Sequence, residues 1–113
     1  MTGISNKENQ FIEDMLEILT ALGKVTVLTK PKYFALHKDD ILFGKIEEMQ
    51  VFLLDEKEQF EKIDAGTIDK IIKRSIDRQA LDYFILKATK SCWAAKERAK
   101  IISQHNALLE EIS

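Results

Sequence analysis

Cys92 is the residue whose type and position most suggest chemistry in this sequence of 113 residues. The pattern Ser91-Cys92-Trp93 is predicted to open a helix, where the aligned backbone amides lower the pKa of a thiol. Nucleophilic catalysis by a thiolate also needs a base, and neither His37 nor His105 is near Cys92 in the sequence. We therefore favour Cys92 as a small core residue over a redox-sensing or catalytic thiol.

Two pairs of adjacent carboxylates, Asp39-Asp40 and Glu47-Glu48, are the other groups whose types suggest chemistry. Both pairs lie between apolar runs and lack the alternating acidic spacing of a calcium loop, so we interpret them as solvated hairpin turns. The sequence has no glycine-rich phosphate loop, nucleophile-elbow pattern, paired-cysteine pattern or zinc-binding histidine pair. We expect no catalytic residue, no cofactor and no metal, and hence a protein that is not an enzyme.

Three aromatic side chains, Tyr33, Tyr83 and Trp93, have the stacking capacity that binding of single-stranded nucleic acid uses. They lie far apart in an acidic chain. We therefore favour core or partner-interface positions for them over a stacking platform.

Charge is distributed unevenly along the chain, although the formal net charge is only −2 and the pI is about 5.7. Residues 67–100 hold nine basic and four acidic side chains, whereas residues 1–66 and 101–113 are acidic. A DNA-binding domain usually has a pI above about 9, so direct DNA binding is disfavoured. Nucleic-acid or anion binding through 67–100 is the alternative function, with neutralisation of the acidic segments as the simpler interpretation. The candidate patch for an anionic partner consists of Lys70, Lys73, Arg74 and Arg78.

Length and composition predict one small domain spanning residues 1–113, with 45% hydrophobic residues to supply a core. No apolar run approaches the ~20 residues that a membrane span needs, and the N-terminus lacks a signal-peptide pattern. The lone cysteine cannot form an internal disulfide, which indicates a cytoplasmic location.

The first half of the chain predicts a helix followed by a β-meander. Ser5 opens a capping box, and apolar residues at helical spacing predict a helix over 5–22 that ends at Gly23. Short apolar runs joined by connections of two to four residues then predict four antiparallel strands. These strands are expected at 24–29, 33–37, 41–46 and 49–54.

The second half predicts helices and one further strand. Asp55 is expected to cap a helix over 56–64 that Gly66 ends, and 67–80 has a helical period that favours a helix or an irregular turn. The run 81–88 is aromatic and branched and predicts a strand, followed by a helix from Ser91 whose end, 101–113, protrudes or frays. The predicted fold class is a two-layer α+β domain, with an antiparallel β-meander packed against N- and C-terminal helices.

The order of these elements resembles the N-terminal domain of TfoX/Sxy competence regulators over residues 10–100. The matching segments include "LFGKI" (42–46), "VFLLDE" (51–56), the stretch from Phe60 to Gly66, and "DYF" (82–84). The family often has a glycine-rich stretch between its first two strands, whereas Thr29-Lys30-Pro31-Lys32-Tyr33 has no glycine. Longer family members continue into a second helical domain, and the family would make residues 67–80 partly extended.

The resemblance implies a bacterial, cytoplasmic, non-enzymatic regulator of natural competence (DNA transformation). It implies action with a transcription activator of the cyclic-AMP-responsive type rather than direct reading of DNA. Our leading hypothesis is therefore a regulatory or adaptor domain that binds a protein partner, with a homodimer as a further expectation. The candidate surfaces are a sheet edge, the final helix beyond Ile101, and the basic patch of the 67–100 segment.

Overall fold

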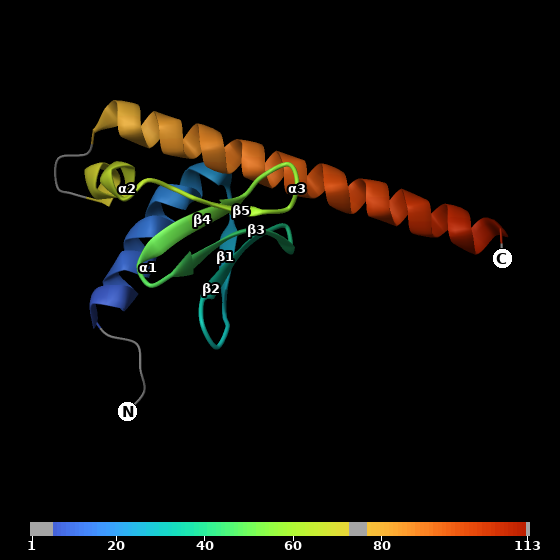
Figure 1. The fold of residues 1–113 in the computed structure, drawn as a ribbon, viewed down its shortest axis with the longest axis horizontal. Helices are drawn as coiled ribbons and strands as arrows, with labels where there is room; N and C mark the ends of the chain where they lie inside the picture. Colours follow the sequence, from blue (N-terminus) through green and yellow to red (C-terminus); the bar gives the residue numbers. More distant parts are fainter. Residues whose placement is uncertain (1–5, 73–76, 113) are drawn as a thin grey trace.

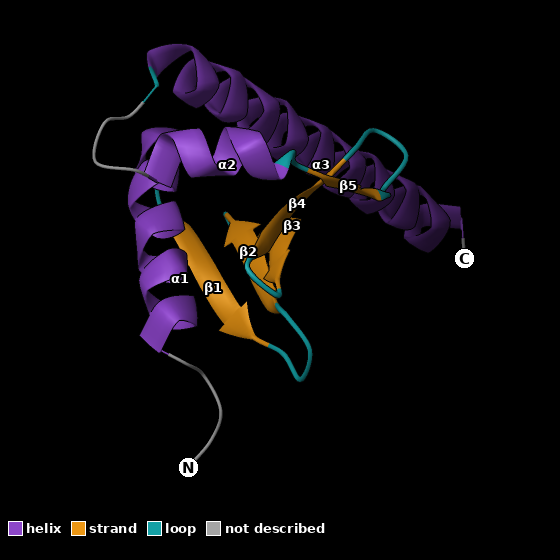
Figure 2. Ribbon diagram, turned by 60° about the vertical axis from the view of Figure 1, so that its left-hand side comes forward, coloured by secondary structure: helices purple, strands orange, loops and turns teal. Residues whose placement is uncertain are grey.

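The computed structural model describes residues 6–72 and 77–112, with side chains described over 7–72 and 77–106. The chain forms a five-stranded antiparallel sheet with helices packed on one of its faces (Figures 1 and 2), which confirms the predicted α+β class. The elements in chain order are α1 (Asn6–Leu19), η1 (Thr20–Leu22), β1 (Val25–Thr29), β2 (Phe34–Lys38), β3 (Ile41–Glu47), β4 (Gln50–Leu54), β5 (Phe60–Lys62), α2 (Ala65–Ile72) and α3 (Arg78–Ile112).

The first helix forms as its apolar spacing predicts. Phe11, Met15 and Leu19 are buried on one side of α1, and a short 3₁₀ turn extends the helix to Leu22. Gly23 follows with a φ of 106°, a conformation that glycine adopts without the steric cost of a Cβ. The predicted cap at Ser5 lies outside the described residues.

The sheet is a meander in the order β1-β2-β3-β4-β5. Two-residue turns at Asp39-Asp40 and Glu48-Met49 join β2 to β3 and β3 to β4, and all four residues have positive φ, as type I′ hairpins require. The interpretation as a turn is confirmed for Asp39-Asp40. For the second pair it holds only for Glu48, because Glu47 is the last residue of β3 and pairs with Gln50. The β2–β3 register shifts after Leu36, because Leu36 pairs with Gly44 whereas His37 pairs with Leu42. Phe43 of β3 therefore has no partner on β2 and is the extra residue of a β-bulge.

The predicted helix over 56–64 is wrong, because this segment forms a loop and the short strand β5. The Asp55 carboxylate accepts hydrogen bonds from the backbone N–H groups of Lys57 (2.8 Å) and Gln59 (2.9 Å), closing a tight turn instead of capping a helix. Phe60 then pairs with Leu54, so that β5 extends the sheet beyond the four predicted strands.

The segment after β5 is helical where it is described. Asp64 accepts a hydrogen bond from the Thr67 N–H (3.2 Å) and so caps the start of α2. Gly66 lies inside the first turn of α2, so it does not end a preceding helix as predicted. Ile68 and Ile71 are buried, as the helical period predicts, and residues 67–72 are not extended as the family resemblance implied.

The predicted strand at 81–88 is wrong, because these residues belong to α3. The helix begins at Arg78, where Asp77 accepts a hydrogen bond from the Ala80 N–H (3.1 Å), and it runs without a break through Ser91. Phe84 and Ala88 lie four residues apart and are both fully buried, so packing against the sheet selects the helical period.

Ser91 joins α3 to the sheet at the point where β3 and β4 diverge. Its buried hydroxyl lies 2.7 Å from the Phe43 carbonyl oxygen and 2.8 Å from that of Leu54, and these two acceptors share its single proton. These two carbonyls lie just beyond the last β3–β4 ladder pair, Gly44 with Leu53. The hydroxyl therefore fixes both the position of α3 along the sheet and its rotation about the helix axis.

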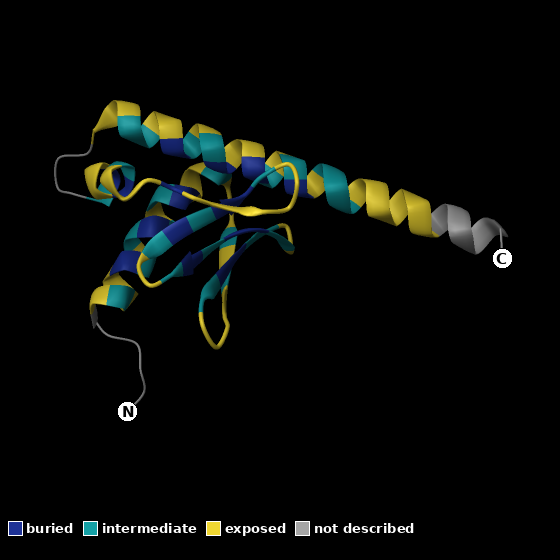
Figure 3. Cartoon of the chain, viewed as in Figure 1, coloured by how far each residue is buried: buried dark blue, intermediate teal, exposed yellow. Residues whose placement is uncertain are grey.

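The last part of α3 extends past the sheet (Figures 1 and 3). Residues 101–106 are exposed, and the helix continues to Ile112. The described side chains of 101–106 thus form an exposed stretch of helix beyond the sheet.

Candidate functional site

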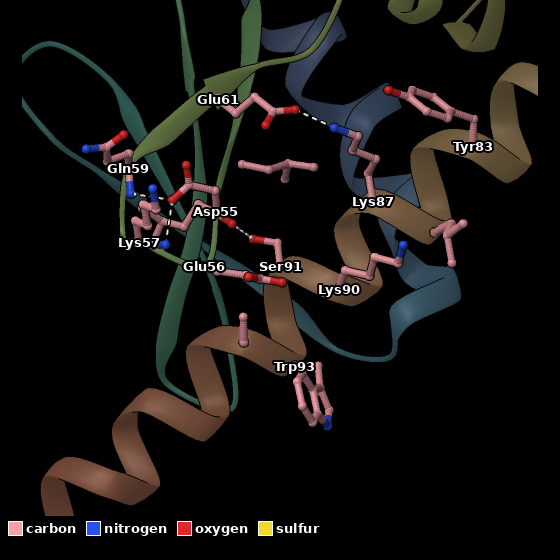
Figure 4. A pocket seen from close by; sticks show the side chains of 14 residues that line it. Asp55, Glu56, Lys57, Gln59, Glu61, Tyr83, Lys87, Lys90, Ser91 and Trp93 are labelled. Carbon is pink, nitrogen blue, oxygen red and sulfur yellow. Dashed lines mark hydrogen bonds and ion pairs between the residues drawn. The ribbon is translucent and has the colours of Figure 1, made fainter.

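A groove of about 720 Å³ lies between α3 and the connection from β4 to β5 (Figure 4). One wall is formed by the turn at residues 55–59 and by Glu61 of β5, and the other by the first half of α3. Its volume is in the range of binding sites for small ligands or single side chains of a partner.

The loop wall of the groove is held rigidly. The N–H groups of Gln59 and Lys57 hold the pKa of the Asp55 carboxyl below its usual value, with the Gln59 bond as the largest cause. Arg98 of α3 donates to the Asp55 carbonyl oxygen (3.0 Å) and pairs with the Glu58 carboxylate (3.0 Å). The wall is therefore tied to α3 before any partner binds.

An ion pair crosses the far end of the groove. The Lys87 ammonium contacts the Glu61 carboxylate, and this hydrogen bond raises the pKa of Lys87. The same ammonium lies 5.7 Å from the centre of the Tyr83 ring. Because both charged groups are partly exposed, the pair contributes at most about 1 kcal/mol to stability; it positions side chains more than it stabilises the fold.

The rim of the groove on α3 is unusually apolar for an exposed helix. Tyr83 is 48% exposed, Leu86 54% and Trp93 66%. Of the eight large apolar side chains exposed in the described part of the chain, five lie on α3. Lys90 lies between these rim residues, within the same lining (Figure 4). Exposed aromatic and apolar side chains grouped in this way are typical of the central part of a protein-binding surface.

The sequence singled out two of these rim residues and missed the others. Tyr83 and Trp93 lie on the groove, whereas Tyr33 lies on the other face of the sheet, 5.3 Å from the Lys45 ammonium. Leu86 and Glu61 were not expected to take part. Tyr83, Leu86 and Trp93 are spaced to lie on one side of a helix. The interpretation of 81–88 as a strand left this spacing unrecognised.

The predicted basic patch is only partly described. Lys70 lies in α2 and Arg78 is the first residue of α3, both exposed, on either side of residues 73–76. Lys73 and Arg74 lie outside the described residues. Anion binding by this patch therefore stays a prediction.

The two histidines lie in different elements of the fold. His37 is in β2, and its Nδ1 is buried with no hydrogen-bond partner among the described residues; His105 is exposed on the protruding part of α3. Across the described residues, no group of three or more His, Cys, Asp or Glu side chains is placed to hold a metal ion.

The predicted lowering of the Cys92 pKa is wrong. Because α3 begins at Arg78, Cys92 lies in the middle of the helix, half-buried, and far from the amides that would stabilise a thiolate. Burial instead raises the pKa of the Cys92 thiol from 9.0 to about 11. The half-buried position agrees with a packing role.

We expect Cys92 to react with a thiol reagent about 100-fold more slowly at pH 8 than a cysteine of pKa near 9. Only the thiolate reacts, and raising the pKa by two units lowers the thiolate fraction at this pH about 100-fold. The rate should keep rising with pH up to about 11. The rate is measured from the absorbance of the chromophore that the thiol reagent releases, and the urea-unfolded chain serves as the control. Equal rates in the folded and unfolded chain would contradict the raised pKa.

Comparison with protein-family models, with curated proteins and with solved structures finds no match to this chain. None of the helices in the described part of the chain combines the length and apolarity that crossing a bilayer requires. The interpretation of the groove therefore depends on its own residues.

Proposed function

We propose that this chain is a non-enzymatic regulatory or adaptor domain that binds a protein partner through the groove and its rim on α3. The observation that carries the proposal is the exposure of Tyr83, Leu86 and Trp93 along one side of a groove with a rigid opposite wall. Tyrosine and tryptophan are the residue types that most often dominate protein–protein binding energy.

The resemblance to TfoX/Sxy N-terminal domains supplies the biological setting of this proposal. In that setting the domain acts in the bacterial cytoplasm on natural competence, and its partner is a transcription activator of the cyclic-AMP-responsive type. The groove favours such a partner over DNA, because its lining mixes basic side chains with carboxylates such as Asp55, Glu56 and Glu61.

Trp93 provides a direct test, because it is the only tryptophan in the chain. The chain is labelled with fluorotryptophan, and its single ¹⁹F resonance is followed while the purified activator of the same organism is added with cyclic AMP. We expect the resonance to shift, because the partner covers a ring that is 66% exposed in the free chain.

A matched pair of variants shows whether the rim is responsible. Leu86→Glu, on the rim, is expected to weaken binding by about 30-fold or more, the effect of losing a hot spot. Leu28→Glu, an equally exposed position on β1, should leave binding unchanged. An unshifted resonance at saturating activator would refute this partner, and equal losses in both variants would refute the site.

A further inference from the structure

The face of the sheet opposite the helices carries a lysine surrounded by aromatic rings. Three ring centres lie close to the Lys45 ammonium, those of Phe60 (4.7 Å), Phe52 (5.0 Å) and Tyr33 (5.3 Å). The Glu47 carboxylate accepts a hydrogen bond from the same ammonium at 2.9 Å. The three rings and this carboxylate form an aromatic cage. None of its residues lines the groove beside α3.

The register of the sheet brings the side chains of the aromatic cage together. Lys45 and Phe52 lie directly opposite each other on β3 and β4, so their side chains share one face of the sheet. Phe60 of β5 lies two residues from the partner of Phe52, at a diagonal distance that long and aromatic side chains span. Ile46, next to Lys45, is buried in the core, which places the cage on the other face. Tyr33, directly before β2, completes it.

The aromatic cage attracts positive charge but offers few hydrogen-bond acceptors. An ammonium group has three N–H donors, and Glu47 is the sole acceptor for Lys45 in the part of the chain that the structure describes. Ring faces attract a cation electrostatically and accept only weak hydrogen bonds. The Lys45 side chain is 19% exposed, so its ammonium gives up much of its hydration without full replacement. A methylated ammonium has fewer N–H groups to satisfy and adds methyl groups that pack on the rings.

The aromatic cage is open to a ligand from solution. Phe60 is 40% exposed, and the Glu47 carboxylate is partly exposed beside it. The Lys45 side chain has a flexible four-carbon stem, and residues 45 and 47 lie on the same face of β3. Lys45 can therefore move out of the cage toward water while it stays close to Glu47.

We propose that the aromatic cage binds a methylated ammonium group, and that Lys45 occupies the cage in the free chain until this ligand displaces it. The group belongs either to a small molecule of the choline type or to a methylated lysine side chain of another protein, since both present the same N-methyl groups. The proposal is independent of the proposed function, because it uses the opposite face of the sheet.

The NMR signal of the Lys45 ε-methylene group reports directly on this exchange. In a chain with ¹³C-labelled lysine, ring currents are expected to shift this signal upfield of the other lysines, and its absence from Lys45→Arg assigns it. Tetramethylammonium chloride is expected to move the signal toward the position of an exposed lysine, whereas ammonium chloride should not. The proposal is overturned if the signal stays unmoved at about 100 mM tetramethylammonium, where a site with a Kd of about 10 mM would be ~90% filled. Equal movement in the two salts would also overturn it.

A matched pair of lysine variants tests whether Lys45 competes for the aromatic cage. Lys45→Ala empties the cage and is expected to bind tetramethylammonium about tenfold more tightly than the unaltered chain, as followed by the ring signals of Tyr33. Lys62→Ala removes the same charge from an exposed position on β5 and should leave the affinity unchanged. An affinity of Lys45→Ala equal to that of the unaltered chain, or an equal gain in both variants, contradicts the proposal.

Two further probes distinguish the sources of the methylated group. Choline and N-acetyl-trimethyl-lysine amide are titrated in the same way, with ethanolamine and N-acetyl-lysine amide as their unmethylated controls. Each methylated probe is expected to bind more tightly than its control. The tighter of the two methylated probes identifies the source as a small molecule or a protein side chain, and equal binding of probes and controls refutes recognition of the methyl groups.

Discussion

Replacing Phe84 by alanine is expected to lower the free energy of unfolding by about 3–5 kcal/mol, the usual cost of removing a buried aromatic ring. Phe84 is fully buried at the centre of the contact between α3 and the sheet. A domain of this size has a total stability of only about 5–15 kcal/mol, so the variant is expected to be partly unfolded near its growth temperature. Urea denaturation followed by far-ultraviolet circular dichroism measures the change.

Leu86→Ala is the matched control for this truncation. It lies two residues further along the same helix, is 54% exposed, and should change the free energy of unfolding by no more than about 0.5 kcal/mol. The contrast also tests the secondary structure, because residues two apart in a strand share a face whereas in a helix they do not. A large, equal loss in both variants would favour the strand interpretation of 81–88.

The elements whose signals are local could be predicted from the sequence. The period of Phe11, Met15 and Leu19 specifies an amphipathic helix, and polar pairs such as Asp39-Asp40 mark hairpin turns between apolar runs. Short connections then leave an antiparallel meander as the simplest arrangement. The class of fold therefore followed from the first half of the chain.

The errors lie where distant contacts decide the structure. An aspartate such as Asp55 accepts hydrogen bonds from backbone N–H groups two to four residues further on, both in a tight turn and at the start of a helix. The pairing of Phe60 with Leu54 selects the turn. Residues 81–88 are aromatic enough for a strand, but burial of Phe84 and Ala88 against the sheet selects a helix. The candidate site was missed as a unit, because its walls are these two misassigned segments. Tyr83 and Trp93 were identified by residue type alone.

Gly44 is expected to tolerate no side chain. A Cβ on Gly44 would lie 2.6 Å from the Phe52 carbonyl oxygen, a backbone atom that cannot move without breaking the β3–β4 ladder. The nearest side-chain atom, Leu53 Cδ2, would lie at 3.1 Å, so the core offers no space either. We expect Gly44→Ala to cost about 3 kcal/mol or more, at or above the upper end of ordinary overpacking, and Gly44→Val to abolish cooperative unfolding.

Gly66→Ala provides the control for this prediction, because its new Cβ would meet no backbone atom but only the Asp64 carboxylate, the end of a side chain that accepts the Thr67 N–H, at 2.9 Å. Gly66 lies in the first turn of α2, where alanine favours the helix by up to about 1 kcal/mol. Displacing the Asp64 oxygen weakens the cap of α2 by about 1 kcal/mol and so offsets this gain. The thermal midpoint of Gly66→Ala should therefore change little, while that of Gly44→Ala falls by several degrees. Gly44 is next to the bulge residue Phe43, whose carbonyl oxygen lies within hydrogen-bond distance of the Ser91 hydroxyl. If Gly44→Ala kept the wild-type thermal midpoint, β3 would not approach β4 and α3 as closely as described.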